Sequence, residues 1–106
     1  MQITILESPY AGNVKANITY AQQCMRDMLL RGESPYASHL LYTQPNVLDD
    51  DKPDERKLGI EAGFAFKHLP TAKTAFYADL GFSKGMDLAM DYCLENNLEF
   101  EIRHLK

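Results

Sequence analysis

The stretch from Gly81 to Met86 combines the residue types of an anion-binding turn. It follows a segment typical of a strand, precedes an apolar pattern typical of a helix, and contains Ser83 and Lys84. The first N–H groups of a helix have no partner inside the helix and lie at the positive end of its dipole. Together with the serine hydroxyl and the lysine ammonium group, several unpaired amides near Ser83–Met86 would therefore form a phosphate site.

The same turn also fits a purely structural interpretation. Ser83 is a favourable N-cap residue, and glycines on both sides of it are common in turns. The sequence contains neither a GxGxxG pattern nor a complete P-loop pattern, either of which would favour a phosphate site. On spacing alone, both interpretations stay open.

The segment Ser8–Asn13 likewise leads from a predicted strand into a predicted helix, for which Asn13 is the predicted N-cap. If the strands before the two turns are neighbours, the two helix starts lie side by side, and Tyr10 offers a flat stacking surface. That arrangement suits a phosphorylated nucleoside or an ADP-ribose-like molecule. The alternative is a tight turn with a half-buried tyrosine. The candidate ligand-binding residues of this segment are Ser8, Pro9, Tyr10 and Gly12.

Three further positions are candidates for the same site. His39 follows the second predicted strand and would share an edge of the sheet with Ser8, although a structural hydrogen-bonding role is the alternative. Asp49, in an acidic run that ends at Asp51, has the chemistry to position a ribose or a metal; the alternative is a solvated loop that caps a helix. Glu61 lies on the next predicted helix, within reach of the site as a candidate catalytic carboxylate.

Strands and helices alternate along the chain in the order β-α-β-α-β-α-β. This order predicts one α/β domain over residues 1–106, a small three-layer sandwich with a parallel four-stranded sheet of Rossmann- or flavodoxin-like type. Ligands bind beyond the carboxyl ends of such strands, where the loops 8–13, 38–51 and 79–85 would meet. The predicted strands are 2–7, 36–38, 74–78 and 98–102, and the predicted helices are 13–31, 53–67 and 86–95.

Composition excludes several functional classes. The 106 residues include eleven basic and fifteen acidic side chains, scattered along the chain, so we expect neither a nucleic-acid partner nor a membrane partner. No secretory signal pattern is visible, and we expect a cytoplasmic protein. Cys24 and Cys93 belong to no metal-ligand or CxxC pattern, which predicts buried free thiols and no metal or cofactor. We interpret Glu55 and Arg56 as members of ion pairs on a helix surface.

Five stretches of the chain together resemble the nucleoside 2-deoxyribosyltransferase-like superfamily. The more specific resemblance, over nearly the whole chain, is to a group of short phage and bacterial proteins of this superfamily. The stretches that carry the resemblance are Leu6–Gly12, Ala37–Gln44, Leu48–Asp50, Glu55–Gly63 and Asp79–Met86.

The resemblance implies a carboxylate nucleophile on the helix after the Ser83 turn, because enzymes of the superfamily cleave N-glycosidic bonds through a covalent sugar intermediate. Alignment on Ser83 places Ala89 at the nucleophile position, whereas alignment on the pair Gly85 and Met86 places Asp87 there. We prefer the serine register, in which the nucleophile is absent. Asp87 remains a candidate catalytic residue in the other register.

These observations lead to one hypothesis and one alternative. The hypothesis is a nucleotide-binding protein without catalysis, of use to a phage for sequestering a nucleotide defence signal such as a cyclic ADP-ribose derivative. The alternative is a nucleoside deoxyribosyltransferase or nucleotide N-glycosidase that acts through a carboxylate. A chain this short leaves little room for a deep site, so we expect a homodimer or larger homo-oligomer whose second subunit closes the pocket.

Overall fold

Four strands pair into a single parallel sheet in the order β2-β1-β3-β4 in the computed structural model, which describes residues 1–106. The predicted neighbours, the first and third strands, are adjacent, and the predicted α/β fold class is confirmed. The strands are β1 (Gln2–Glu7), β2 (Glu33–Tyr36), β3 (Lys73–Tyr77) and β4 (Phe100–Arg103). The helices are α1 (Val14–Leu30), α2 (Ser38–Leu41), α3 (Pro53–Ala65) and α4 (Lys84–Glu95), with a 3₁₀ turn at Phe66–His68.

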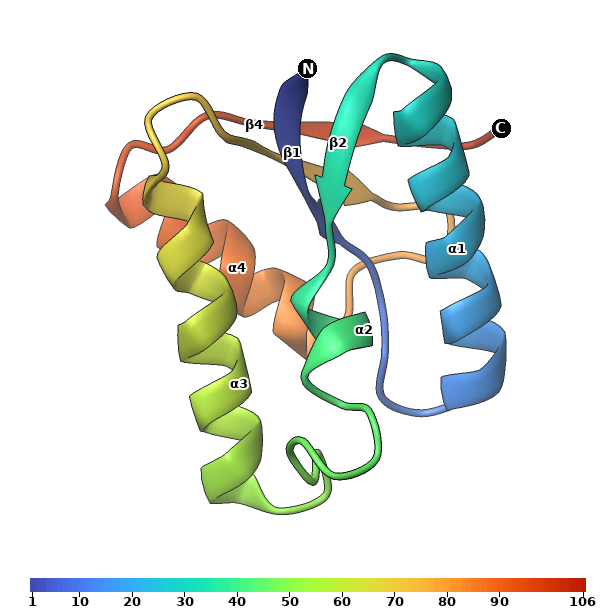
Figure 1. Ribbon diagram of the computed structural model, residues 1–106, viewed down its shortest axis with the longest axis vertical. Helices are drawn as coiled ribbons and strands as arrows, with labels where there is room; N and C mark the ends of the chain where they lie inside the picture. The colour runs from blue at the N-terminus through green and yellow to red at the C-terminus, as the bar shows by residue number, and fades with distance from the viewer.

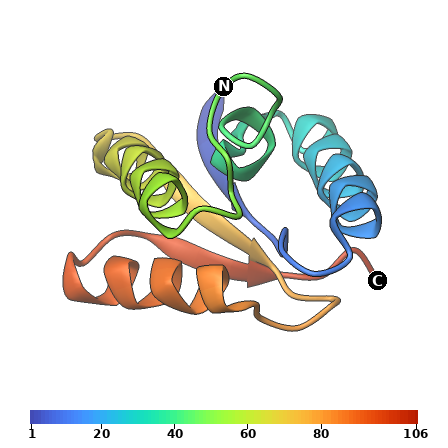
Figure 2. The same cartoon turned by 90° about the horizontal axis from the view of Figure 1, so that it is seen from below.

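Helices cover both faces of this sheet. Successive side chains of a strand point to opposite faces, and the buried strands carry apolar side chains on both. In Figure 1, α1 lies on one side of the strands and α3 and α4 lie on the other. Leu6, Ala75 and Tyr77 pack with α1 in one buried cluster, whereas Phe76 packs with α4 in a second. Figure 2 shows the resulting layers from the end at which the candidate loops lie.

Local sequence signals explain where α1 and α4, the two helices with a side-chain N-cap, begin. The side chain of Asn13 accepts a hydrogen bond from the N–H of Ala16 at the start of α1. Ser83 does the same for Met86 at the start of α4. Both N-caps were predicted from the sequence. The predicted cap at Asp51 is wrong: Lys52 precedes α3 without a side-chain cap bond, and Pro53 begins the helix.

The second strand lies earlier than the sequence pattern predicts. It spans Glu33–Tyr36 rather than residues 36–38, and the apolar residues after it form the short helix α2. Its position follows from a buried ion pair: both guanidinium nitrogens of Arg103 donate to the carboxylate of Glu33, each at 2.6 Å. Pro35 is tolerated there because β2 is an edge strand.

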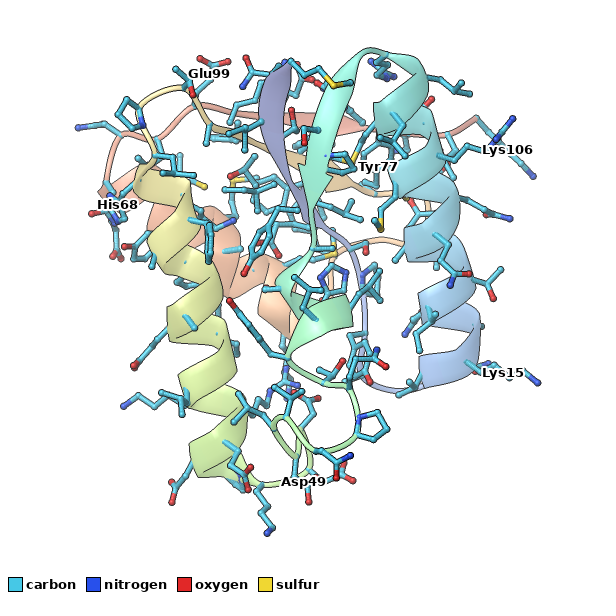
Figure 3. All side chains as sticks on the ribbon, in the orientation of Figure 1. Lys15, Asp49, His68, Tyr77, Glu99 and Lys106 are labelled. Atoms are coloured by element: carbon cyan, nitrogen blue, oxygen red, sulfur yellow. The ribbon has the colours of Figure 1, made fainter.

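The two cysteines lie in the two clusters that flank the sheet. Cys24 packs in the α1 cluster and Cys93 in the α4 cluster, and both are buried free thiols, as predicted. The α1 cluster also holds Tyr77, labelled in Figure 3, whose hydroxyl donates to the carboxylate of Asp27 on α1 at 2.6 Å. No helix combines the length and the apolar character needed to cross a bilayer.

Candidate functional site

A pocket of about 350 Å³ lies at the carboxyl edge of the sheet, where the three predicted loops meet. Residues from α3 complete its wall, although Glu61, the residue of this helix that the sequence predicts there, is not among them. Most of the predicted ligand-binding residues line this pocket. They are Ser8, Tyr10, Gly12, His39, Ser83, Lys84, Gly85 and Met86.

Two predicted binding residues do not reach the pocket wall. Pro9 is buried beneath the loop after β1. Asp49, labelled in Figure 3, lies on the loop between α2 and α3 at the far end of the molecule, where its carboxylate accepts a hydrogen bond from the N–H of Asp51. Its neighbour Asp50 lines the pocket instead.

The loop after β1 is held by a buried asparagine. The side-chain amide of Asn17 on α1 donates to the carbonyl groups of Tyr10 and Ala11, at 2.9 and 3.2 Å. Gly12 adopts a positive φ of 98°, a conformation that favours glycine, and this lets the chain turn into α1. The half-buried ring of Tyr10 meets the ring of His39 edge-on, with centroids 6.5 Å apart. Stacking of a nucleoside base on Tyr10 stays a prediction.

Ser8 and His39 form a hydrogen-bonded pair in the pocket wall. The hydroxyl oxygen of Ser8 lies 2.8 Å from Nε2 of His39. Burial, aided by the positive charge of Lys67, lowers the pKa of His39 to about 4. The imidazole is therefore neutral at pH 7 and can accept a proton from the serine.

Glu7 lines the pocket and forms an ion pair that the sequence does not predict. Nζ of Lys67 lies 2.6 Å from a carboxylate oxygen of Glu7, and the lysine side chain is only 1% exposed. Burial raises the pKa of Glu7, an effect that Lys67 partly offsets. The feature of the sequence that could have indicated a role for Glu7 is its position as the last residue of a buried strand, directly before Ser8.

Arg56 also belongs to the pocket rather than only to a helix surface. Its guanidinium group forms an ion pair with Asp50 at 3.0 Å. A methyl group placed on Gly85 would lie 3.8 Å from Nη2 of Arg56, so the cation lies beside the first turn of α4. Arg56, Gly59 and Ile60 all line the pocket. Their spacing of three and four residues, which places them on one side of a helix, was the feature of the sequence that could have indicated this. Glu55, the other predicted surface residue, faces Lys52 at 3.7 Å.

The start of α4 has the geometry of an ordinary capped helix, so the structural interpretation of Ser83 is confirmed. Besides the side-chain cap, the carbonyl of Ser83 accepts the N–H of Asp87 at 3.0 Å. The amides of Lys84 and Gly85, the first two residues of the helix, have no acceptor inside it. These two N–H groups border the pocket and are free for an anion, so the phosphate site stays a prediction compatible with the cap.

The two predicted catalytic carboxylates lie outside the pocket. Asp87 and Glu61 are exposed, and Glu61 faces Lys57 at 3.9 Å. Met86 and Ala89 form the buried side of α4, which turns Asp87 to the opposite side. The carboxylates that line the pocket are Glu7, Asp50 and Glu55. No group of three or more histidine, cysteine or acidic side chains is arranged to hold a metal ion.

Comparison with known proteins assigns the chain to a family. No curated protein and no solved structure matches the chain. One family model, described as "Domain of unknown function (DUF7768)", matches residues 2–103. The match covers every strand and helix of the fold, from β1 to β4, and all residues of the pocket. The chain therefore belongs to the DUF7768 family.

Proposed function

We propose that this protein binds a phosphorylated nucleoside or an ADP-ribose-type nucleotide in the pocket at the carboxyl edge of the sheet, without cleaving the glycosidic bond of the ligand. The observation that carries the proposal is the position of Arg56 beside Gly85 in the first turn of α4. A permanently charged guanidinium group and a helix N-terminus thereby border the same pocket as the aromatic ring of Tyr10.

The phosphate end of the ligand would lie between α3 and α4. Arg56 uses one of its five N–H donors in its hydrogen bond to Asp50, which leaves others for an anion. The free amides of Lys84 and Gly85 and the ammonium group of Lys84 add further donors. A phosphate group matches this set because it accepts several hydrogen bonds at once.

The nucleoside end would lie toward the loop after β1 and the helix α2. Tyr10, Tyr42 and His39 supply aromatic surface there, and Thr43 supplies a hydroxyl group. The carboxylate of Asp50, between the two ends, is an acceptor for ribose hydroxyl groups. Such a mixture of apolar surface and a few polar groups is typical of pockets that bind small organic molecules.

Binding without glycosidic cleavage is supported by α4. Ala89, the nucleophile position in the serine register, is fully buried and has no reactive group, and Asp87 is exposed outside the pocket. The resemblance to short phage proteins suggests a role in the cytoplasm of a bacterial host. There the protein would sequester a nucleotide defence signal such as a cyclic ADP-ribose derivative.

Titration calorimetry tests the proposal with a panel of nucleoside monophosphates, ADP-ribose and cyclic ADP-ribose isomers. We expect at least one ligand to bind with a Kd below about 100 µM, tighter than about −5.5 kcal/mol. Arg56→Met should weaken that binding about tenfold or more, through loss of a charge-assisted contact. The adjacent Lys57→Met, outside the pocket, is the matched control and should leave Kd unchanged. If no ligand of the panel binds at 100 µM, the proposal is wrong.

An N-glycosidase or deoxyribosyltransferase is the second candidate, and the carboxylate of Glu7 is the observation that favours it. This carboxylate lines the pocket, and its raised pKa suits a group that gives a proton to the departing base. Incubation with deoxynucleoside monophosphates would release free base, and Glu7→Gln would abolish the release. Absence of free base from the wild-type protein at high enzyme concentration rejects this candidate.

The proposal includes a homodimer or larger homo-oligomer, in which a second subunit covers the open side of the pocket. Light scattering coupled to size exclusion should give a multiple of the 12.1 kDa chain mass. A species of one chain mass at all protein concentrations contradicts this part of the proposal and leaves the nucleotide site to be judged by calorimetry.

A further inference from the structure

Ser8 and His39 line the proposed nucleotide pocket, but the nucleotide proposal makes no use of the hydrogen bond between them. Ser8 comes directly after β1 and is 6% exposed, and its hydroxyl oxygen lies 2.8 Å from Nε2 of His39. Both side chains line the pocket. A serine hydroxyl within hydrogen-bond distance of an imidazole nitrogen is the arrangement of an activated nucleophile and its base.

Several contacts hold His39 in place. It lies on α2, where Ser38 is pressed against α3: a methyl group on Gly63 would lie only 2.5 Å from the Ser38 hydroxyl oxygen. The hydroxyl of Thr43 donates to the carbonyl of His39 at 2.6 Å. These contacts fix the backbone at the first two residues of the short helix, and the imidazole reaches Ser8 from there.

The imidazole also has the protonation state that a base needs. The pKa of His39 is lowered to about 4, first by burial and then by the charge of Lys67, so Nε2 is free to accept a proton at neutral pH. The other groups close to it are the hydroxyl of Ser8 and the ring of Tyr10.

Donors for a developing oxyanion follow Ser8 in the chain. Pro9 has no N–H, and the N–H groups of Tyr10, Ala11 and Gly12 donate to no backbone carbonyl. Asn17 binds the carbonyls of Tyr10 and Ala11 and so holds this loop against α1. Free backbone amides next to a nucleophile are the usual source of oxyanion stabilisation.

We propose that Ser8 and His39 form a nucleophile–base pair that hydrolyses small carboxylic esters in this pocket, an activity beyond nucleotide binding. Oγ of Ser8 bonds to the ester carbonyl carbon while its proton passes to Nε2 of His39. The bond from that carbon to the alcohol oxygen then breaks, and the alcohol leaves with the proton from His39. A water molecule, deprotonated by His39, attacks the acyl-serine and releases the carboxylic acid and the free hydroxyl of Ser8.

A fluorophosphonate probe and p-nitrophenyl acetate test this pair. The wild-type protein should gain one probe adduct, located on Ser8 by peptide mass mapping, and should release nitrophenolate. Ser8→Ala should abolish the adduct, and His39→Gln should slow labelling by about 100-fold or more, the usual contribution of a general base. Ser34→Ala and His104→Gln, at exposed positions outside the pocket, are matched controls and should label as the wild type does.

The wild-type protein alone can overturn the proposal. If the folded protein gains no adduct, or gains it at a residue other than Ser8, the pair is not a nucleophile and its base. Labelling of Ser8 that is as fast in a folded His39→Gln variant contradicts the role of His39. Circular dichroism before labelling ensures that each variant is folded. Calorimetry of the wild-type protein with the nucleotide panel tests the proposed function separately, because nucleotides can bind to a protein that gains no adduct.

Discussion

Nζ of Lys67 lies 2.6 Å from a carboxylate oxygen of Glu7, although 60 positions separate the two residues in the chain. Lys67 extends from the 3₁₀ turn after α3, and Glu7 is the last residue of β1. The hydroxyl of Thr74 on β3 lies 3.4 Å from the same nitrogen. This contact ties the 3₁₀ turn after α3 to a central strand of the sheet, at a carboxylate that lines the pocket.

Breaking the pair should destabilise the fold strongly. Glu7→Gln leaves the ammonium group of Lys67 buried without an opposite charge, which costs about 3–5 kcal/mol in the free energy of unfolding. Urea denaturation followed by circular dichroism measures the loss. In the exposed pair Lys57 and Glu61, the matched change Glu61→Gln should cost about 1 kcal/mol or less. A loss for Glu7→Gln as small as that of the control would show that the buried pair does not hold the fold.

Gly63 should tolerate no side chain. In Gly63→Ala the new methyl group would lie 2.5 Å from Oγ and 2.8 Å from Cβ of Ser38, so α2 must move away from α3. We expect a loss of about 1–3 kcal/mol in thermal or urea unfolding. Adding Ser38→Gly removes both clashing atoms and should restore most of the loss. If the double variant is no more stable than Gly63→Ala, the clash is not the cause.

Gly59→Ala is the matched control for that substitution. It lies on the same helix, and its new methyl group would meet only Cδ1 of Leu48, at 3.2 Å, and Cβ of Tyr42, at 3.8 Å. A leucine side chain can shift by a few tenths of an ångström, and alanine favours a helix over glycine by up to about 1 kcal/mol. We therefore expect this variant to unfold within about 1 kcal/mol of the wild type.

Acidification should weaken the fold through His39. The pKa of this histidine falls from 6.5 to about 4 on folding, chiefly through burial. Between these pH values the unfolded chain binds a proton that the folded chain does not, so the free energy of unfolding falls as the pH is lowered through this window. The effect is at most about 3 kcal/mol. Urea unfolding from pH 7 to pH 4 measures it.

The variant His39→Gln separates the contribution of His39 to the pH dependence of stability from the contribution of the carboxylates. The pKa values of Asp27, Glu33 and Asp79 are lowered in the fold, so they also destabilise it on acidification, but only near and below their ordinary values. Glutamine at position 39 does not titrate, and the variant should lose less stability than the wild type between pH 6.5 and pH 5. Equal slopes in the two proteins over that range would contradict a depressed pKa at His39.

The variant Ser83→Asp should separate the two roles of position 83, because it keeps the N-cap of α4 but disfavours an anion beside it. Aspartate is as good an N-cap as serine, so the free energy of unfolding should stay within about 0.5 kcal/mol of the wild type. The added negative charge lies at the edge of the pocket and should weaken binding of a phosphorylated ligand about tenfold or more. Calorimetry and urea unfolding on the same sample measure both quantities.

Asn13→Asp is the control for that experiment, because it changes the N-cap of the neighbouring helix α1 in the same way at a position outside the pocket. It should change neither quantity by more than the measurement error. If Ser83→Asp binds the ligand as tightly as the wild type, the anion lies elsewhere in the pocket.

Much of the fold was predictable because its signals are local. The capping side chains of Asn13 and Ser83 act on amides three residues away, and the strands next to them are rich in β-branched or aromatic residues. The alternation of strands with helices then restricts the sheet to a parallel arrangement. The second strand was misplaced because its position depends on Arg103, which lies 70 positions from Glu33.

The candidate site was predictable only in part. The loops that approach it follow from the topology, since parallel strands end at one edge of the sheet. The sequence did not reveal that Arg56 lies beside the start of α4, because that depends on how α3 is rotated about its own axis. It did not reveal the exclusion of Asp49 and Glu61 either, since exposure of a polar residue depends on the packing around it.

The sequence by itself therefore determined the α/β architecture, two helix caps and the edge of the sheet where the candidate pocket lies. Only the tertiary structure decided which side chains face one another there: Glu7 with Lys67, Ser8 with His39, and Arg56 with the first turn of α4. The physical reason is distance along the chain. Backbone propensity and capping act over a few residues, whereas these contacts join segments that only packing brings together.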